Sequence, residues 1–106
     1  YLCELSDLNI KLPKHFNLKE ASWHLFPIRC KDRENLVRKL KSMDIETLIH
    51  YPIPVHKQKA YHSESSTVKL PICEKMSSEL LSLPIGPHLD LGQVEFVIEA
   101  LKNNVN

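Results

Sequence analysis

Glycine is scarce in this chain, because only Gly86 and Gly92 occur among its 106 residues. Gly-rich phosphate-binding loops need several closely spaced glycines, since the backbone must approach the phosphate without side chains in the way. Loops of that kind are therefore excluded. The three cysteines, Cys3, Cys30 and Cys73, form no CxxC pair, so neither a disulfide framework nor a zinc ribbon is expected. We expect reduced, mostly buried thiols.

Long apolar runs and an excess of one charge are also missing. No window approaches the roughly 18 apolar residues of a membrane span, and no signal-like segment opens the chain. Fourteen basic and thirteen acidic side chains leave a net charge of +1, whereas nucleic-acid binding needs a basic face. We expect no membrane partner, no nucleic-acid partner and a cytoplasmic location.

The composition is that of an ordinary globular protein, with 42% hydrophobic and 25% charged residues. The length suits one compact domain. The chain starts in the middle of a pattern and without Met, so we expect it to be a piece of something longer. Residues 1–21 predict a short helical turn followed by an irregular segment, because Pro13 interrupts any regular helical or strand spacing of the apolar residues.

Periodicity predicts the remaining elements. Residues 23–30 favour a mostly buried strand with Pro27 at an edge or bulge, and Asp32 favours an N-cap before a helix whose apolar stripe is Leu36, Val37, Leu40 and Met43. Residues 45–49 favour a short strand that Pro52 and Pro54 end in a stiff loop. Residues 57–70 are expected to be a mobile surface segment.

The C-terminal third predicts a helix behind Pro71 with Ile72, Met76 and Leu80 stacked on one face, then a strand-like fragment at 82–88. Asp90 and Gln93 have the spacing of a capping box before a last helix with an apolar face of Val94, Val97, Ile98 and Leu101. This order predicts an α/β (α+β) fold, a short, mostly antiparallel sheet with helices packed on it.

Chemistry-bearing side chains gather between His50 and His62. His50, His56 and His62 are six residues apart, and two prolines prevent a helix that would bring them together, so we expect no metal site. Cys30 and Cys73 fit a core better than a nucleophile, and we assign no catalytic residue. Two interpretations remain: a proline-stiffened surface loop, or a pre-organised loop that presents imidazole and phenol donors to a polar ligand.

The runs HLFPIRCKDRENLVRKLKSMDIETLIHYPIPVHKQKAY and LPICEKMSSELLSLPIGPHLDLGQVEFVIEALK resemble the C-terminal small domain of the DegT/DnrJ/EryC1/StrS family. The resemblance covers residues 23–102 and implies two segments, a lead-in at 1–22 and a small domain at 23–106. It implies a parent enzyme of fold-type I that uses pyridoxal 5'-phosphate (PLP) to transfer an amino group, usually from glutamate, to a keto group on a nucleotide-linked sugar.

The same resemblance implies what this chain lacks. In the family the aldimine lysine and the other cofactor contacts belong to a large PLP-binding domain that precedes the matched region, and the parent is a homodimer. We therefore expect no cofactor-binding residue here and no activity of the chain alone. The alternative is a non-enzymatic, stand-alone module that binds a sugar nucleotide or a protein.

Carried over position by position, the family's HYP-x-P-x-H-x-Q-x-x-Y motif implies substrate-side roles for His50, Tyr51, His56, Gln58 and Tyr61. Imidazole and phenol groups can donate to sugar hydroxyls and to a diphosphate. Departures from the family pattern are Asp44 in place of a glycine, Lys59 in place of a proline, and Gly92 in place of an acidic residue. A left-handed helix end at Asp44 is expected, since Asp tolerates that conformation.

Overall fold

The computed structural model describes residues 1–14, 21–61 and 67–105. Its elements follow the order β1 (Phe26–Arg29), α1 (Arg33–Lys41), η2 (Val55–Lys57), η3 (Lys59–Tyr61), α3 (Pro71–Glu79), β2 (Leu80–Leu83) and α4 (Leu91–Asn104), where η2 and η3 are single 3₁₀ turns. The α+β class predicted from the sequence is confirmed.

A small antiparallel sheet joins distant parts of the chain. β1 pairs with β2, so that Pro27 faces Ser82. Ser82 uses its amide and carbonyl on the far side, where both bond to Leu48, so no bond to Pro27 is missing. Pro27 thus occupies a position that needs no amide, as predicted. The strands are shorter than the expected ones, and the strand predicted at 45–49 is a single bridge at Leu48.

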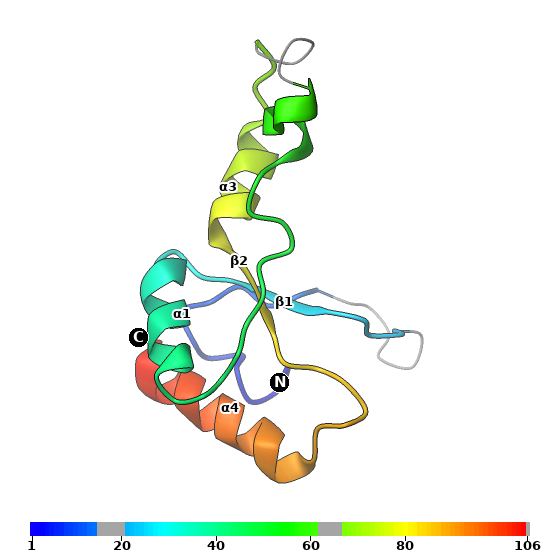
Figure 1. Ribbon diagram of the computed structural model, residues 1–106. Helices are drawn as coiled ribbons and strands as arrows, with labels where there is room; N and C mark the ends of the chain where they lie inside the picture. The colour runs from blue at the N-terminus through cyan, green and yellow to red at the C-terminus, as the bar shows by residue number, and fades with distance from the viewer. Residues whose placement is uncertain (15–20, 62–66, 106) are drawn as a thin grey trace.

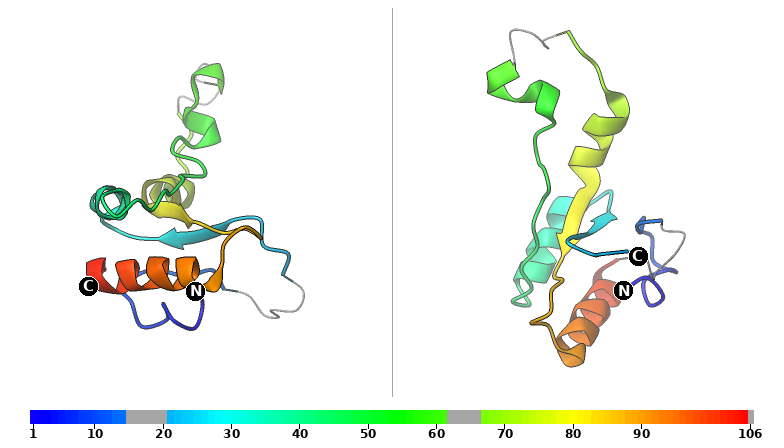
Figure 2. Two further views of the ribbon diagram at one scale, coloured as in Figure 1. Left: turned by 60° about the horizontal axis from the view of Figure 1, so that its bottom comes forward. Right: turned by 90° about the vertical axis from the view of Figure 1, so that its right-hand side faces the viewer.

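Helices α1 and α4 complete the core of the molecule. α4 lies along one face of the sheet (Figure 2) and contacts α1. The largest fully buried side chains come from the opening segment, both strands and both helices: Leu5, Ile28, Leu40, Leu81 and Leu101. The opening segment thus packs into the core instead of trailing from it, and its Tyr1 hydroxyl donates to the Pro84 carbonyl at 2.9 Å.

The predicted helix ends are partly confirmed. Asp90 accepts from the Gln93 amide at 2.8 Å, and the Asp90 amide donates to the Gln93 side chain at 3.0 Å, so the capping box exists. Asp32 stands at the N-cap of α1, but its side chain makes no capping bond. Asp44 has a φ of 57°, which confirms the left-handed end expected after α1. Pro71 is the first residue of α3, as predicted.

Figures 1 and 2 show two regions of different character. The body comprises residues 1–14, 21–49 and 80–105, and the arm, residues 50–61 and 67–79, projects from it as η2, η3 and α3. The radius of gyration is 15.5 Å, whereas a compact chain of this length has about 13 Å. The accessible surface of 8046 Å² likewise exceeds the roughly 6,100 Å² of a compact monomer.

The arm corrects several expectations. Leu80 was predicted on the helix but opens β2, because pairing with β1 extends the backbone there. Ile72 was predicted in an apolar stack but is 77% exposed, since no other element covers that face of α3 among the described residues. Cys73 is exposed for the same reason, and Cys3 is exposed in the opening turn, so only Cys30 is buried as expected.

Two more expectations concern the arm and the membrane. Within the segment 57–70, which was expected to be mobile, Lys57 ends η2 and residues 59–61 form η3, while residues 62–66, His62 among them, lie outside the described residues. Nowhere in the described chain is there a helix with the length and apolar character that crossing a bilayer requires.

Candidate functional site

The five predicted site residues all lie on the arm, in order from its base to its tip. At the base, the His50 ring nitrogen Nδ1 lies 3.0 Å from the Ser82 hydroxyl. Ser82 is a buried polar residue of the sheet, so this contact satisfies its hydroxyl and ties the start of the arm to the body. Tyr51 packs edge-on against His50, with ring centres 5.6 Å apart, and is 72% exposed.

Toward the tip, His56 and Lys57 meet a carboxylate from α3. His56 Nε2 lies 3.1 Å from Glu74 Oε1, and Lys57 Nζ donates to Glu74 Oε2 at 2.6 Å. The Leu70 amide, at the N-cap of α3, also donates to Glu74 Oε1 at 3.1 Å. The Lys57 hydrogen bond, followed by those of Leu70 and His56, lowers the pKa of Glu74 to about 2.

Gln58 follows the turn that holds His56, and Tyr61 ends the next turn. The Gln58 amide donates to the Val55 carbonyl at 3.1 Å, and the Tyr61 amide donates to the Gln58 carbonyl at 3.0 Å. Both side chains are exposed. The turns therefore set the spacing of these two groups through the backbone, while their side chains face outward where a ligand or another domain could reach them.

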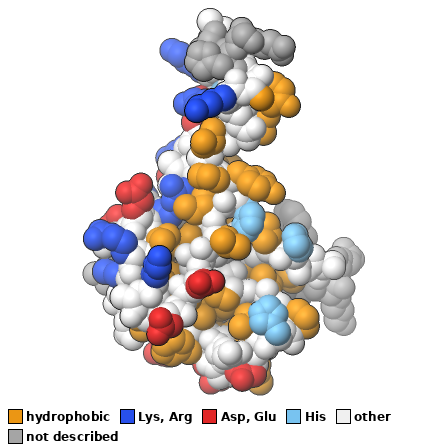
Figure 3. All heavy atoms as spheres, viewed as in Figure 1, with side chains coloured by type: hydrophobic (Ala, Val, Ile, Leu, Met, Phe, Trp, Pro, Cys, Tyr) orange, Lys and Arg blue, Asp and Glu red, His pale blue; other side chains and the backbone are white. Residues whose placement is uncertain are grey.

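A largely apolar groove runs between the proline-rich segment and α3. Its volume is about 580 Å³, and it is lined by His50, Tyr51, Ile53, Pro54, Val55, Leu70, Pro71, Ile72, Cys73, Met76, Ser77 and Leu80. Of the predicted residues, His50 and Tyr51 line this groove, whereas His56, Gln58 and Tyr61 do not. Figure 3 shows hydrophobic side chains gathered along the arm and onto the body.

The base of the arm is held by arginines from the body. Arg29 on β1 donates through Nε and Nη2 to Glu79 Oε2 at 3.0 and 2.7 Å, and this hydrogen bond lowers the pKa of Glu79. Arg33 donates to the Ser77 and Leu80 carbonyls at the end of α3. Cations at a helix C-terminus stabilise its exposed carbonyls, so these contacts fix where the arm leaves the sheet.

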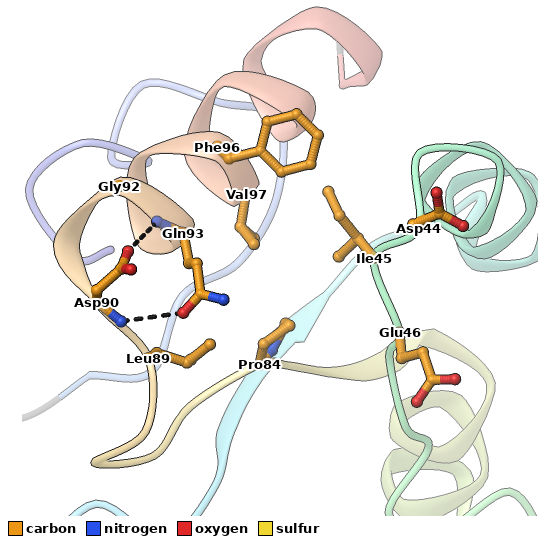
Figure 4. A pocket seen from close by; sticks show the side chains of 10 residues that line it. All are labelled: Asp44, Ile45, Glu46, Pro84, Leu89, Asp90, Gly92, Gln93, Phe96 and Val97. Atoms are coloured by element: carbon orange, nitrogen blue, oxygen red, sulfur yellow. Dashed lines mark hydrogen bonds between the residues drawn. The ribbon is translucent and has the colours of Figure 1, made fainter.

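A second hollow, of about 520 Å³, lies in the body beside the start of α4. Figure 4 shows Phe96 and Val97 facing Ile45 across it, with Pro84 and Leu89 nearby. The Asp90 carboxylate on its rim accepts the Gln93 amide and serves as the cap of α4. None of the predicted site residues reaches it, so it is separate from the arm.

The polar side chains of the described residues limit which metals or cofactors this chain could hold. No three His, Cys, Asp or Glu side chains among them are placed to hold a metal ion. Every described lysine is exposed, whereas an aldimine lysine needs burial or a cationic neighbour to lower its pKa. The described residues therefore do not fit PLP by themselves. They can supply hydrogen-bond donors, a cation and an apolar surface to a ligand held elsewhere.

The sequence interpretation missed two residues, Glu74 and Ser82. An acidic residue in the first turn after Pro71 is a recognisable signal of a helix start, and Glu74 could have been noticed on that basis. Its partners could not, since they lie 17 and 18 residues away. Ser82 carried no signal, because its hydroxyl acquires its role only when His50 is brought beside the sheet.

This chain is similar in sequence to proteins of one known family. The DegT/DnrJ/EryC1/StrS aminotransferase family matches residues 1–102. A dTDP-3-amino-3,6-dideoxy-alpha-D-galactopyranose transaminase of Aneurinibacillus thermoaerophilus is 46% identical over 95% of this chain and 28% of its own. The erythromycin biosynthesis sensory transduction protein EryC1 of Saccharopolyspora erythraea is 42% identical over 96% of this chain and 28% of its own.

Solved structures agree with the sequence relatives. DesV of S. venezuelae, in complex with a ketimine intermediate, superposes with a TM-score of 0.90 at 41% identity, over 97% of this chain and 28% of DesV. NtdA of Bacillus subtilis, with bound cofactor PMP, gives a TM-score of 0.86 at 30% identity, over 97% of this chain and 25% of NtdA. The chain thus spans about a quarter of the length of the proteins it matches, and it belongs to the DegT/DnrJ/EryC1/StrS aminotransferase family.

Proposed function

We propose that this chain is the C-terminal small domain of a PLP-dependent aminotransferase that transfers an amino group from glutamate to a keto nucleotide sugar. Such an enzyme would act in glycan, lipopolysaccharide or related sugar biosynthesis. The family match over residues 1–102 carries the proposal. Relatives named as transaminases of dTDP-linked amino sugars support the substrate class. The division into a lead-in at 1–22 and a domain at 23–106 remains a prediction.

The proposal assigns the cofactor to the rest of the polypeptide. PLP supplies an electron sink for the reaction when it is bound, and the exposed lysines described in this chain do not fit its covalent attachment. The role of this chain is then to close one side of the substrate site. It follows that the chain alone has no aminotransferase activity.

The arm is the part that would meet the substrate. His50, Tyr51, His56, Gln58 and Tyr61 follow one another along it, and their ring and amide groups can donate to or accept from the hydroxyls of a nucleotide sugar. The contact of His50 with Ser82 orders the base, and that of His56 with Glu74 orders the tip. Polar groups held in place in this way lose less entropy on binding.

The exposed apolar surface of the arm supports a partner domain and a homodimeric parent. Among the described residues, seven of the ten large hydrophobic side chains that are exposed lie on the arm: Tyr51, Ile53, Val55, Tyr61, Val68, Leu70 and Ile72. Contiguous apolar surface of this kind marks an interaction site. We propose that the large PLP-binding domain, in the same or the second subunit, covers it.

The test uses the full polypeptide that contains this chain. We expect amino transfer from glutamate to a keto nucleotide sugar, and His56→Ala should slow the half-reaction with the sugar nucleotide more than the half-reaction with glutamate. Single-turnover spectroscopy of each half-reaction measures both. His24→Ala, at an exposed position of the body, is the control. Equal losses in both half-reactions would assign His56 to structure alone, and no transfer with any keto nucleotide sugar would refute the proposed function.

A further inference from the structure

One carboxylate gathers donors from both halves of the arm. Glu74 Oε1 receives the Leu70 amide and faces His56 Nε2, each at 3.1 Å, while Oε2 receives the Lys57 ammonium at 2.6 Å. Leu70 caps α3, whereas His56 and Lys57 belong to η2. Glu74 thus joins the proline-rich segment to the helix across 17 and 18 residues of sequence.

The contact also determines which nitrogen of His56 carries a proton. An ionised carboxylate only accepts hydrogen bonds, so His56 Nε2 must donate to it. The pKa of Glu74, lowered to about 2, keeps the carboxylate ionised at neutral pH. The His56 side chain is 9% exposed and that of Glu74 is 29% exposed, so the pair is partly shielded from water and its geometry is restricted.

Apolar packing does not provide this order. No side chain of η2, η3 or α3 belongs to the buried core. Val55, beside His56, is 65% exposed. Where burial is slight, local stability is low unless polar contacts replace it, and charge-assisted hydrogen bonds are the strong ones.

We propose that Glu74 is the positioning residue of the arm: it holds His56 in the tautomer with a proton on Nε2 and keeps the Lys57 ammonium beside the ring. As a consequence, an imidazole and an ammonium are presented to the nucleotide sugar in one arrangement. This consequence rests on the proposed function. Glu74 itself acts through these two groups and does not touch the reacting atoms.

Two substitutions separate the charge from the contacts. Glu74→Gln retains an acceptor at Oε1 for Leu70 and His56 but presents an amide to Lys57, whereas Glu74→Ala removes all three contacts. Glu95→Gln, an exposed carboxylate on α4, is the matched control for loss of charge. Circular dichroism of each variant reports whether α3 and the body remain folded.

The first readout is the protonation of the His56 ring, which does not depend on activity. Long-range ¹H–¹⁵N spectra of histidine-labelled protein distinguish the two tautomers, and the His56→Asn spectrum assigns the signal. We expect the proton on Nε2 in the parent, in Glu74→Gln and in Glu95→Gln, and a smaller fraction of the Nε2-protonated ring in Glu74→Ala. An unchanged His56 tautomer in folded Glu74→Ala would overturn the proposal.

The second readout is kinetic and uses the full polypeptide. We expect Glu74→Ala to raise KM for the nucleotide sugar about tenfold, as loss of one charge-assisted contact would, with KM for glutamate unchanged. Glu74→Gln should lie between Glu74→Ala and the parent. Equal KM values for the sugar in parent and Glu74→Ala would overturn the positioning role. A parent enzyme without any transfer to nucleotide sugars would refute the proposed function, while the ring spectra would still decide the contact.

Discussion

The body and the arm are stabilised by different forces. The body places Leu5, Ile28, Leu40, Leu81 and Leu101 fully out of contact with water, and the strands and helices that carry them cover one another. The arm contributes nothing to that core. It is held instead by Arg29 at its base and by Glu74 at its tip.

This difference separates a region that has a hydrophobic core from one that has none among its described residues. Apolar burial stabilises by about 25 cal/mol per Å², and the body gathers nearly all of it in the described chain. Polar contacts near the surface contribute little each, because water competes for them. An arm built on such contacts keeps its apolar groups exposed, which suits a surface that another domain completes.

The largest expected effect is a core truncation in the body. Leu101→Ala should lower the free energy of unfolding by about 2–5 kcal/mol, since a fully buried leucine leaves a cavity. Ile72→Ala on α3, which is 77% exposed, should change it by no more than about 0.5 kcal/mol. Urea denaturation followed by circular dichroism measures both. Similar losses for the two variants would mean that the arm is part of the cooperative core.

A smaller effect is expected at the capping box of α4. Asp90→Ala should lower the free energy of unfolding by about 1 kcal/mol, because the Gln93 amide loses its acceptor. Asp90→Asn is the matched control, since Asn caps nearly as well. Equal stability of Asp90→Ala and the parent would show that packing of Val97 and Leu101 alone holds this helix end.

The smallest effect is a pH dependence confined to the arm. Because the folded-state pKa of Glu74 lies at about 2, below its ordinary value of 4.5, its stabilising contribution is present above pH 4.5 and is lost as the pH falls toward 2. The ¹³C shift of the Glu74 carboxyl should titrate with a midpoint near 2. A midpoint near 4.5 would show that the contacts with His56 and Lys57 do not persist in solution.

Local signals predicted much of the body. The Asp90 and Gln93 spacing anticipated the capping box, and the apolar period after it anticipated α4, because both depend on neighbours within a few residues. Asp44 was expected to adopt a left-handed conformation because it stands where the family pattern has a glycine, and it does. The family was predicted from the HYPIPVHKQ and SLPIGPH segments, and the match over residues 1–102 confirms it.

The arm was predicted less well. Periodicity continued α3 through Leu80 and assigned Ile72 to an apolar stack, but pairing with β1 ends the helix at Glu79 and leaves Ile72 exposed. Cys73 was expected in a core that does not reach it. A period shows which side chains share a face of a helix, but it does not show whether anything covers that face.

By itself the sequence determined the helices of the body, the capping box of α4 and the family, because propensity, capping and motif spacing are properties of near neighbours. Only the tertiary structure decided that α3 projects from the sheet, that Ser82 meets His50, and that Glu74 meets His56 and Lys57. Such contacts join residues 17 to 32 positions apart. The path of the chain between them depends on how β1 and β2 pair and on which elements the hydrophobic core includes, and neither can be read from near neighbours in the sequence.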